Sequence, residues 1–460
     1  MENFNEKNII TKSPGKSLLS GGYLILDKSK RGLVINTDTY ITCESFIKYQ
    51  EKADNNCLLI NITSEYLNEN FNYMAYVEED EEKINEPNNK KEKIKELKIT
   101  EKRGKENKWL KNCILSSLFI YLNQKENSFK KIFNKNKQLE INILIKSDYR
   151  FYSFSKDNAS KNIKTGLGSS SALISSLTTN MILIYELSFK NKEYKNNILV
   201  KNIDEQNLKA IILGSCLLSN NLSQNKIGSC FDIISSLFGS QIFIQTQKNL
   251  CLNAPFYFNI ENKNIINDII SYLKDDYIPN ILFLNKDIHF LKNNICFISI
   301  EIGSDTRIFV KKVLEYANNK KIKNLFDDEL FTKLNDINEQ IINLFINNIN
   351  NNELLKDLCK KYRNILRLIS EESKVEIEPK ILTPLLDKLI NNKKIIFSIC
   401  PGAGGYDSII ILGNDGIDKE ELNVEIKQII NEFNINNKNI NIKAGLLDVN
   451  SSQNFGTILN

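Results

Sequence analysis

The residues best suited to chemistry in this chain lie in three glycine-rich stretches, and the central one reads KTGLGSSSA (164–172). Gly166 and Gly168 allow the backbone to approach an anion closely, and the first N–H groups of the helix expected to follow would point at that anion. The serine hydroxyls add hydrogen-bond donors and a candidate metal ligand. The loop is suited to hold a polyphosphate, although a Ser/Gly turn that caps an ordinary helix fits GLGSS alone equally well.

The two flanking stretches read SPGKSLLSGGYLILD (13–27) and CPGAGGYDSIIIL (400–412). In the first, Pro-Gly starts a turn, Lys16 projects a point charge, and YLIL has the apolar density of a buried strand. The second is a glycine turn between two apolar runs. Phosphoryl transfer needs a phosphate cradle, Mg²⁺, neutralising cations and a positioned acceptor, and the sequence offers a candidate for each.

In this order, the three motifs resemble those of the GHMP kinases. Within that group the chain is similar to the phosphomevalonate kinases of eukaryotic type, also through NKIGSCFDIISSLFGS (225–240), DYRFYS (148–153) and VEIEPKILTPLLD (375–387). The resemblance implies an α+β, two-domain GHMP kinase fold. Its N-terminal mixed β/α domain, ribosomal-S5-like and ATP-binding, would span 1–260, and its C-terminal ferredoxin-like α/β domain 261–460.

The resemblance also implies an activity, namely the ATP-dependent phosphorylation of (R)-5-phosphomevalonate to (R)-5-diphosphomevalonate in the mevalonate pathway of isoprenoid biosynthesis. Asp232 matches the catalytic aspartate of the family, Lys16 matches a catalytic lysine near the transferring phosphate, and Ser170 would contact Mg²⁺. The residues expected to bind ATP are Lys164, Thr165, Gly166, Leu167, Gly168, Ser169, Ser170 and Ser171. The residues expected to bind the acceptor are Lys16, Ser229, Lys226 and Gly404.

The chemistry of the acceptor limits what Asp232 must do. A phosphomonoester is already ionised, with a second pKa of about 6, so a strong general base is unnecessary. We expect Asp232 mainly to orient Lys16 and the metal, with proton abstraction as a secondary role. Further candidates for neutralising the two anionic substrates are Arg150, Lys226, Arg307, Arg363 and Arg367.

Three positions depart from the family pattern. Asn225 and Cys230 stand where the family has glycines, so we expect the loop before Asp232 to avoid the most strained backbone angles. Asn220 stands where a histidine is usual. These departures leave a non-catalytic binding or regulatory descendant as an alternative, against which the retention of Lys16, Ser170 and Asp232 argues. Mevalonate kinase is the other alternative, although it generally carries GEHAVVYG-like residues where this chain has GGYLILD.

Composition sets outer limits on the function. The net charge of +5 comes from 61 basic and 56 acidic residues, a balance that argues against a nucleic-acid surface. The nine cysteines lack a C-x-x-C pair and predict reduced, buried thiols, while the single histidine, His289, argues against histidine-dependent chemistry. Without a signal peptide or an apolar span, we expect a cytoplasmic monomer or homodimer whose partners are ATP and phosphomevalonate.

The remaining patterns indicate the elements that position these motifs. Strand-like runs dominate residues 9–75, helical spacing dominates 172–187 and 203–222, and the second half alternates strands with helices. The segment 78–107 is almost wholly charged or polar. Such a segment buries too little apolar area to offset the entropy of ordering, so it is expected to be a disordered insertion.

Overall fold

The computed structural model describes most of the chain. The described residues are 8–51, 56–84, 91–104, 106–125, 128–133, 137–154, 162–190, 198–225, 228–245, 263–284, 295–304, 306–320, 327–414, 416–438, 442–452 and 456–459. The predictions made for Lys226 and His289 lie outside these residues. No helix among the described residues is long and apolar enough to cross a membrane.

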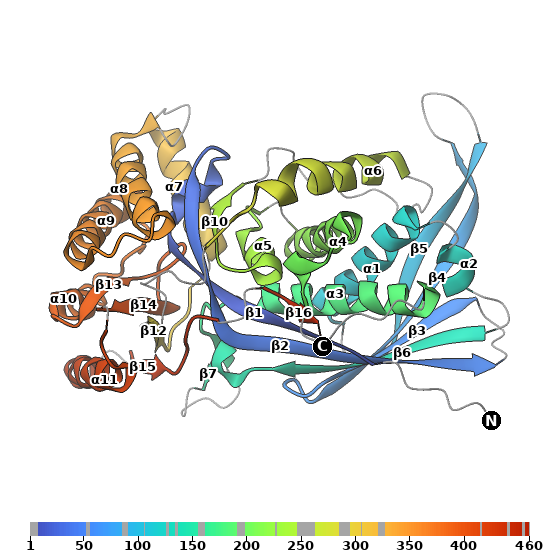
Figure 1. Cartoon of the computed structure of the whole chain (residues 1–460), viewed down its shortest axis with the longest axis horizontal. Helices are drawn as coiled ribbons and strands as arrows, with labels where there is room; N and C mark the ends of the chain where they lie inside the picture. Colours follow the sequence, from blue (N-terminus) through green and yellow to red (C-terminus); the bar gives the residue numbers. More distant parts are fainter. Residues whose placement is uncertain are drawn as a thin grey trace.

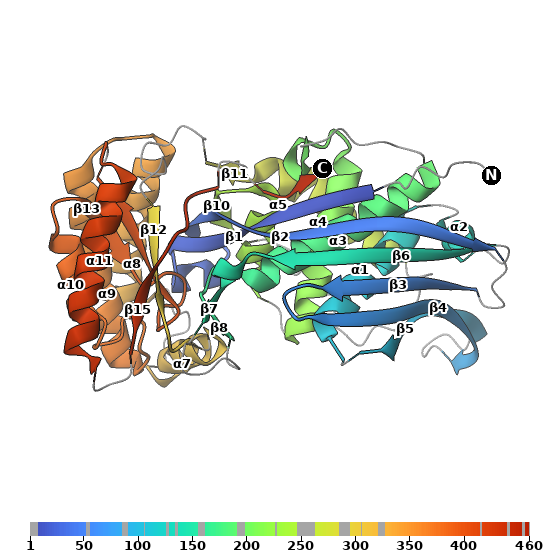
Figure 2. The ribbon, with the colours of Figure 1, turned by 90° about the horizontal axis from the view of Figure 1, so that it is seen from below.

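A ten-stranded sheet forms the base of the first unit, in the order β5-β4-β3-β6-β2-β1-β16-β9 with β10 and β11 attached beside β2 (Figures 1 and 2). Its strands are β1 (Asn8–Ser20), β2 (Arg31–Glu51), β3 (Cys57–Ser64), β4 (Glu69–Ile84), β5 (Lys91–Arg103), β6 (Lys137–Ser147), β9 (Ile198–Leu199), β10 (Gln241–Ile244), β11 (Leu282–Phe283) and β16 (Ile458–Leu459). β3 and β6 run parallel, whereas β1 and β2 form an antiparallel pair.

Helices cover one face of this sheet (Figure 1). They are α1 (Lys108–Gln124), α2 (Ser128–Ile132), α3 (Ser169–Lys190), α4 (Gln206–Gln224), α5 (Phe231–Phe238) and α6 (Lys263–Tyr272). Along β2, Ile41, Cys43 and Ser45 are buried while the residues between them are partly exposed, the alternation of a strand covered on one side. The central helix α3 is fixed to the sheet by Asn180, whose amide donates to the carbonyl oxygens of Ile9 and Cys43, each at 3.0 Å.

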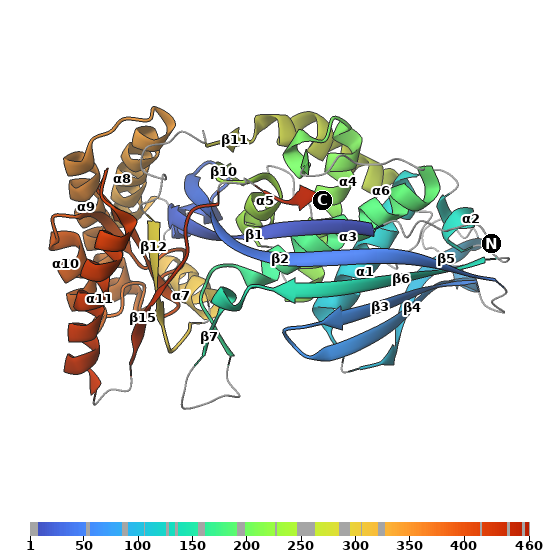
Figure 3. The same cartoon turned by 60° about the horizontal axis from the view of Figure 1, so that its bottom comes forward.

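The second unit is a four-stranded antiparallel sheet in the order β13-β14-β12-β15. The strands are β12 (Ile295–Ile300), β13 (Ile395–Ile399), β14 (Ser408–Gly413) and β15 (Ala444–Leu447), and the helices are α7 (Thr306–Asn319), α8 (Glu329–Ile346), α9 (Asn352–Ser373), α10 (Thr383–Asn391) and α11 (Lys419–Asn436). Helices α9, α10 and α11 lie on the side of this sheet away from the first unit (Figures 1 and 3). The central strands β14 and β12 and the edge strand β13 are buried along their whole length.

Shorter elements connect these layers. They are the two-stranded ribbon of β7 (Tyr152–Phe154) and β8 (Asn162–Lys164) and the short helices η1 (Tyr23–Leu26), η2 (Tyr149–Phe151), η3 (Val200–Asn202), η4 (Leu273–Tyr277) and η5 (Ile278–Asn280). The predicted strand YLIL is wrong, because these residues form the turn of η1. Tyr23, Leu24 and Ile25 are buried there. The apolar density therefore predicted the burial of these residues correctly but their secondary structure wrongly.

Parts of the predicted second domain (261–460) pack with the first sheet. β11 pairs with β10, and β16 pairs with β1 and β9. Both are strands of two residues, too short for periodicity to reveal. The first structural unit thus includes residues that follow position 260 in the sequence. The domain boundary at residue 260 stays a prediction.

Within the segment 78–107, the described residues 78–84, 91–104 and 106–107 differ from the expectation of a disordered insertion. β4 and β5 pair antiparallel from Asn72 with Arg103 to Ile84 with Lys91. Within the charged run KEKIKELKIT, Leu97 and Ile99 alternate with polar residues and are only 2% and 8% exposed. A few apolar residues on one face of a strand suffice to anchor it when the next strand is already in place, which overall composition does not show.

Candidate active site

The loop 164–172, which is predicted to hold phosphate and is called the phosphate loop below, lies directly against β1. The Lys16 N–H donates to the Leu167 carbonyl at 2.8 Å, at a register shift of β1 between Pro14 and Lys16. Gly168 has a φ of +80°, and a Cβ added to it would lie 2.7 Å from Cε of Lys16. Only glycine permits both this backbone angle and this approach, so the side chain of Lys16 lies across the loop.

The residues predicted to bind ATP divide into two groups. Lys164 Nζ donates to Ser170 Oγ at 3.2 Å at the start of α3, where both side chains remain accessible to a ligand. The Thr165 hydroxyl instead donates to the carbonyl of Arg150 at 2.9 Å, and the Ser171 hydroxyl to that of Gly168 at 2.8 Å. These two hydroxyls therefore hold the loop in shape. Leu167 and Ser169 are buried beneath it.

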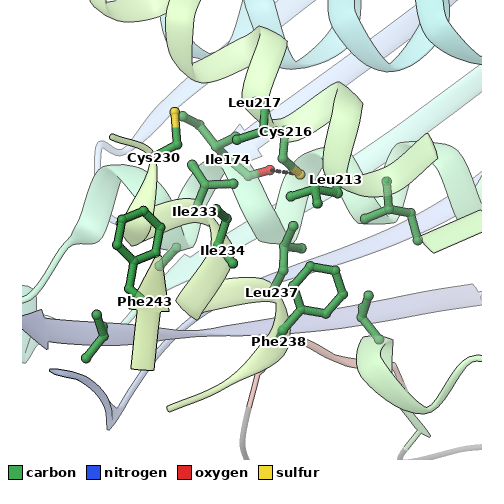
Figure 4. Packing of buried hydrophobic residues seen from close by; sticks show 14 of the residues in the cluster. Ile174, Leu213, Cys216, Leu217, Cys230, Ile233, Ile234, Leu237, Phe238 and Phe243 are labelled. Carbon is green, nitrogen blue, oxygen red and sulfur yellow. Dashed lines mark hydrogen bonds between the residues drawn. The ribbon is translucent and has the colours of Figure 1, made fainter. Parts of the chain in front are cut away.

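Helix α5 brings Asp232 to the same place. Asp232 lies in the first turn of the helix, and its Oδ1 accepts from the N–H of Ile233 at 3.0 Å. The opposite face of α5 is apolar: Ile233, Ile234 and Leu237 pack toward Ile174 of α3 in the buried cluster shown in Figure 4. This packing gives Asp232 a rigid support.

Lys16 is the electrostatic centre of the site. Burial lowers the pKa of its ammonium group, while the nearby Asp232 and, to a smaller extent, Asp407 oppose that effect. Lys16 Nζ also lies 4.9 Å from the centre of the Phe231 ring, next to Asp232 in sequence. The two residues predicted to be catalytic, Lys16 and Asp232, therefore lie close enough to interact.

Asp407 belongs to this site, although the sequence reasoning gave it no role. It follows the PGAGGY turn and precedes β14, and its Oδ1 accepts from the N–H of Ser304 at 2.6 Å. A Cβ added to Gly166 would lie 3.1 Å from Cβ of Asp407, so the phosphate loop contacts this residue. The available signal was an acidic residue at the end of a glycine turn that the motif comparison had already singled out.

The loop before Asp232 does not avoid strained backbone angles. Asn225 ends α4 with a φ of 53°, and Cys230 precedes α5 with a φ of 59°, so both are left-handed. The expectation drawn from the loss of two glycines is wrong, because the chain keeps the glycine-like conformation and tolerates its cost. That cost is about 1–2 kcal/mol for an ordinary residue and less for asparagine.

The residues predicted to bind the acceptor are only partly brought together. Ser229 lies in the described loop 228–230 and is partly buried, three positions before Asp232. Gly404 lies in the turn that contacts β1 through the Gly402 N–H and the Leu18 carbonyl, 3.2 Å apart. A Cβ on Gly404 would lie 2.0 Å from the Ile377 oxygen, so packing within the second unit already requires glycine there.

Most of the candidate cations are engaged elsewhere. Arg150 pairs with Asp148 at 2.7 Å and Asp38 at 3.1 Å, and the buried Arg363 pairs with Glu378 and Asp387, both at 2.8 Å. Arg367 joins the same two carboxylates at 3.5 Å. These arginines stabilise the fold, and Arg307 is exposed on α7. Of the described residues, Lys16 contacts the phosphate loop and Lys164 forms part of it.

Comparison with known proteins relates the chain to one kind of kinase at low identity. It is 25% identical over 279 residues to a phosphomevalonate kinase of Candida albicans, covering 54% of this chain and 56% of that protein. It is 23% identical over 493 residues to "Phosphomevalonate kinase, peroxisomal" of Arabidopsis thaliana, covering 89% and 90% of the two chains. The chain thus spans about half the length of the fungal relatives that it matches. No family model matches it.

Solved structures identify the fold. The Streptococcus pneumoniae phosphomevalonate kinase in complex with phosphomevalonate and AMPPNP superposes with a TM-score of 0.54 at 12% identity, covering 96% of this chain and all of that one. The Methanococcus jannaschii mevalonate kinase superposes with a TM-score of 0.50 at 16% identity, covering 98% and 99%. The chain has the two-domain α+β fold of the GHMP kinases, which confirms the predicted fold class.

Proposed function

We propose that the protein transfers the γ-phosphoryl group of ATP to the phosphate of (R)-5-phosphomevalonate, forming (R)-5-diphosphomevalonate. The observation that carries this proposal is the placement of Lys16 across the phosphate loop beside Asp232, with its N–H bonded to Leu167. The names of the relatives support the choice of acceptor. The general part of the proposal is kinase activity with ATP as the phosphate donor, and the specific part is the identity of the acceptor.

The proposed roles follow the geometry. The Gly166–Gly168 loop and the start of α3 would hold the ATP phosphates, with Lys164 at the rim. Lys16 would neutralise charge on the transferring phosphoryl group, and Asp232 would keep the ammonium group of Lys16 oriented. Ser229 and the turn containing Gly404 would border the acceptor, and Lys226 stays a proposal from sequence. The limits 1–260 and 261–460 likewise stay proposals.

The residues present fit a magnesium ion that enters with the nucleotide. Ser170 Oγ is the hydroxyl at the start of α3, and no cluster of three acidic, histidine or cysteine ligands occurs among the described residues. Mg²⁺ in kinase sites is usually held by phosphate oxygens, waters and one or two protein ligands, which this donor set can supply. Bound there, Mg²⁺ would neutralise phosphate charge during transfer.

Two alternatives remain distinct from this proposal. A mevalonate kinase would use a hydroxyl acceptor with a pKa near 16 and would need Asp232 as a base. A non-catalytic descendant would bind nucleotide without transferring phosphate. Cys230 adopts the left-handed conformation that glycine takes easily, which supports an active kinase over a non-catalytic descendant.

An ADP-release assay with mevalonate and phosphomevalonate side by side tests the proposal. We expect ADP release with phosphomevalonate alone, and none with either acceptor in the Lys16→Met variant. Release with mevalonate alone would refute the acceptor and retain the kinase. ATP binding without release in the presence of either acceptor would identify a non-catalytic protein.

A further inference from the structure

One cation and two carboxylates from separate parts of the chain meet at the phosphate loop: Lys16 from β1, Asp232 from α5 and Asp407 from the turn before β14. The first two were expected from their motifs, and Asp407 is contributed by the second unit. Its contact with Gly166 brings a charged side chain of that unit directly onto the loop proposed to hold ATP. Lys16 therefore has a second carboxylate near it, which comes from the other unit of the fold.

The position of Asp407 is fixed rather than incidental. The Ser304 N–H donates to its Oδ1 at 2.6 Å, while its own backbone carbonyl accepts from the N–H of Ile300 at 3.3 Å. The preceding Tyr406 N–H is held by Ser304 Oγ at 2.6 Å. The carboxylate therefore cannot turn to solvent without breaking its bond with Ser304, while the other two bonds fix the backbone around it.

We propose that Asp407 is a positioning residue for the phosphoryl transfer, which keeps the ammonium group of Lys16 charged and directed at the phosphate loop jointly with Asp232. This inference rests on the proposed function and adds a residue to it. A desolvated lysine loses its proton more readily than an exposed one, and nearby carboxylates oppose that loss. With Asp232 alone, the ammonium group of Lys16 would interact with a carboxylate of the first unit only. Asp407 adds a carboxylate from the second unit.

Among the described residues, Lys16 acts on Asp407 and favours its ionised form, and the buried thiol of Cys400 lies near it. Burial raises the pKa of Asp407 to about 6, so near neutral pH it is ionised and can serve Lys16. Such a value is typical of a charge retained for function, because a purely structural position would be cheaper to fill with a neutral residue.

The variant Asp407→Asn isolates the charge, because its amide oxygen can still accept from Ser304. Asp357→Asn is the matched control, since Asp357 pairs with Lys361 on the exposed side of α9. The ionisation of Lys16 is measured by competitive acetylation at a series of pH values, with mass spectrometry of the Lys16 peptide. This measurement needs neither nucleotide nor acceptor, so it does not depend on the acceptor being right.

We expect Asp407→Asn to lower the pKa of Lys16 by about half a unit or more, and Asp357→Asn to leave it unchanged. The alkaline limb of the kcat/KM profile should move to lower pH by a similar amount, with kcat reduced more than tenfold and ATP affinity nearly kept. An unchanged Lys16 pKa would overturn the inference, and so would a shifted pKa with full turnover. If neither acceptor is phosphorylated even by the unaltered protein, the proposed function fails, and acetylation still decides whether Asp407 controls Lys16.

Discussion

The amide of Asn220 donates to the thiol of Cys230 across 3.6 Å, so two of the three positions where the chain departs from the family pattern contact each other. Gln224 Nε2 in turn donates to the Asn220 oxygen at 2.7 Å, which fixes the orientation of that amide. Cys230 is 9% exposed and joins the buried cluster behind α5. The two replacements therefore form one unit, in which the thiol is held in place while its backbone stays left-handed.

Because of this geometry, we expect glycine at position 230 to give a more stable protein than alanine, the reverse of their usual order of stability. Cys230→Ala keeps the left-handed strain and loses the thiol contacts, whereas Cys230→Gly loses the contacts but relieves the strain. We expect the glycine variant to be more stable than the alanine variant by about 1 kcal/mol. Urea denaturation of both variants measures the difference, and greater stability of the alanine variant would show that the φ of 59° is not maintained in solution.

Local patterns predicted much of the fold. The helical spacing at 172–187 and 203–222 corresponds to α3 (Ser169–Lys190) and α4 (Gln206–Gln224), because apolar periodicity depends only on neighbouring residues. What it missed depends on distant residues. β5 looks disordered until β4 lies beside it, and Asp407 gains a role only when folding brings it to Gly166. Lys16 and Asp232 were assigned from motifs, and their roles stay predictions.

A side chain at position 168 should disable the phosphate loop. In Gly168→Val, Cβ would meet Lys16 Cε at 2.7 Å and Ser171 Oγ at 3.0 Å, so Lys16 must move and the loop must distort. We expect ATP affinity to fall at least tenfold by equilibrium binding, with the folded state retained. Gly416→Ala is the control, because Gly416 also has positive φ (+75°) but open space around it. Equal ATP affinity in both variants would exclude the loop as the nucleotide site.

Removing either central charge should act on turnover. We expect Lys16→Met and Asp232→Asn each to lower kcat by roughly 10²–10³-fold, with a smaller change in ATP affinity, because both act on the transferring group. Lys12→Met on the same strand β1 is the control for Lys16. Steady-state kinetics with a thermal melt of each variant checks this. Near-normal kcat in Asp232→Asn would remove it from the reacting centre.

Shortening a buried side chain of β5 should lower the stability of the protein, although the many charges of this strand suggest a solvated segment. Leu97 is 2% exposed, so we expect Leu97→Ala to lower the free energy of unfolding by about 2–4 kcal/mol. Lys98→Ala, beside it on the exposed face, should cost less than about 1 kcal/mol, although it breaks the 2.9 Å ion pair with Glu96. Similar costs for both variants, measured in urea, would mean that β5 does not pack as described.

Asp407 should make stability depend on pH. Its pKa is raised from the ordinary 3.8 to about 6, so the folded state binds its proton more tightly than the unfolded state does. Ionisation therefore costs stability as the pH rises from about 4 to 6. We expect Asp407→Asn to be more stable than the unaltered protein at pH 7.5, by up to about 3 kcal/mol, and equal to it at pH 4. A less stable variant at pH 7.5 would assign Asp407 a structural role.

The pairing of β16 with β1 can form only near the end of the synthesis of the chain. Ser13 and Thr457 share a hydrogen bond of 2.7 Å although 444 residues separate them. A ribosome that adds about 5–20 residues per second needs roughly 20–90 s to make that intervening chain. During this interval the edge of the strand that carries Lys16 lacks its native neighbour, and an open strand edge can pair with other nascent chains. The strand at the centre of the proposed chemistry therefore needs protection by chaperones until synthesis reaches Thr457.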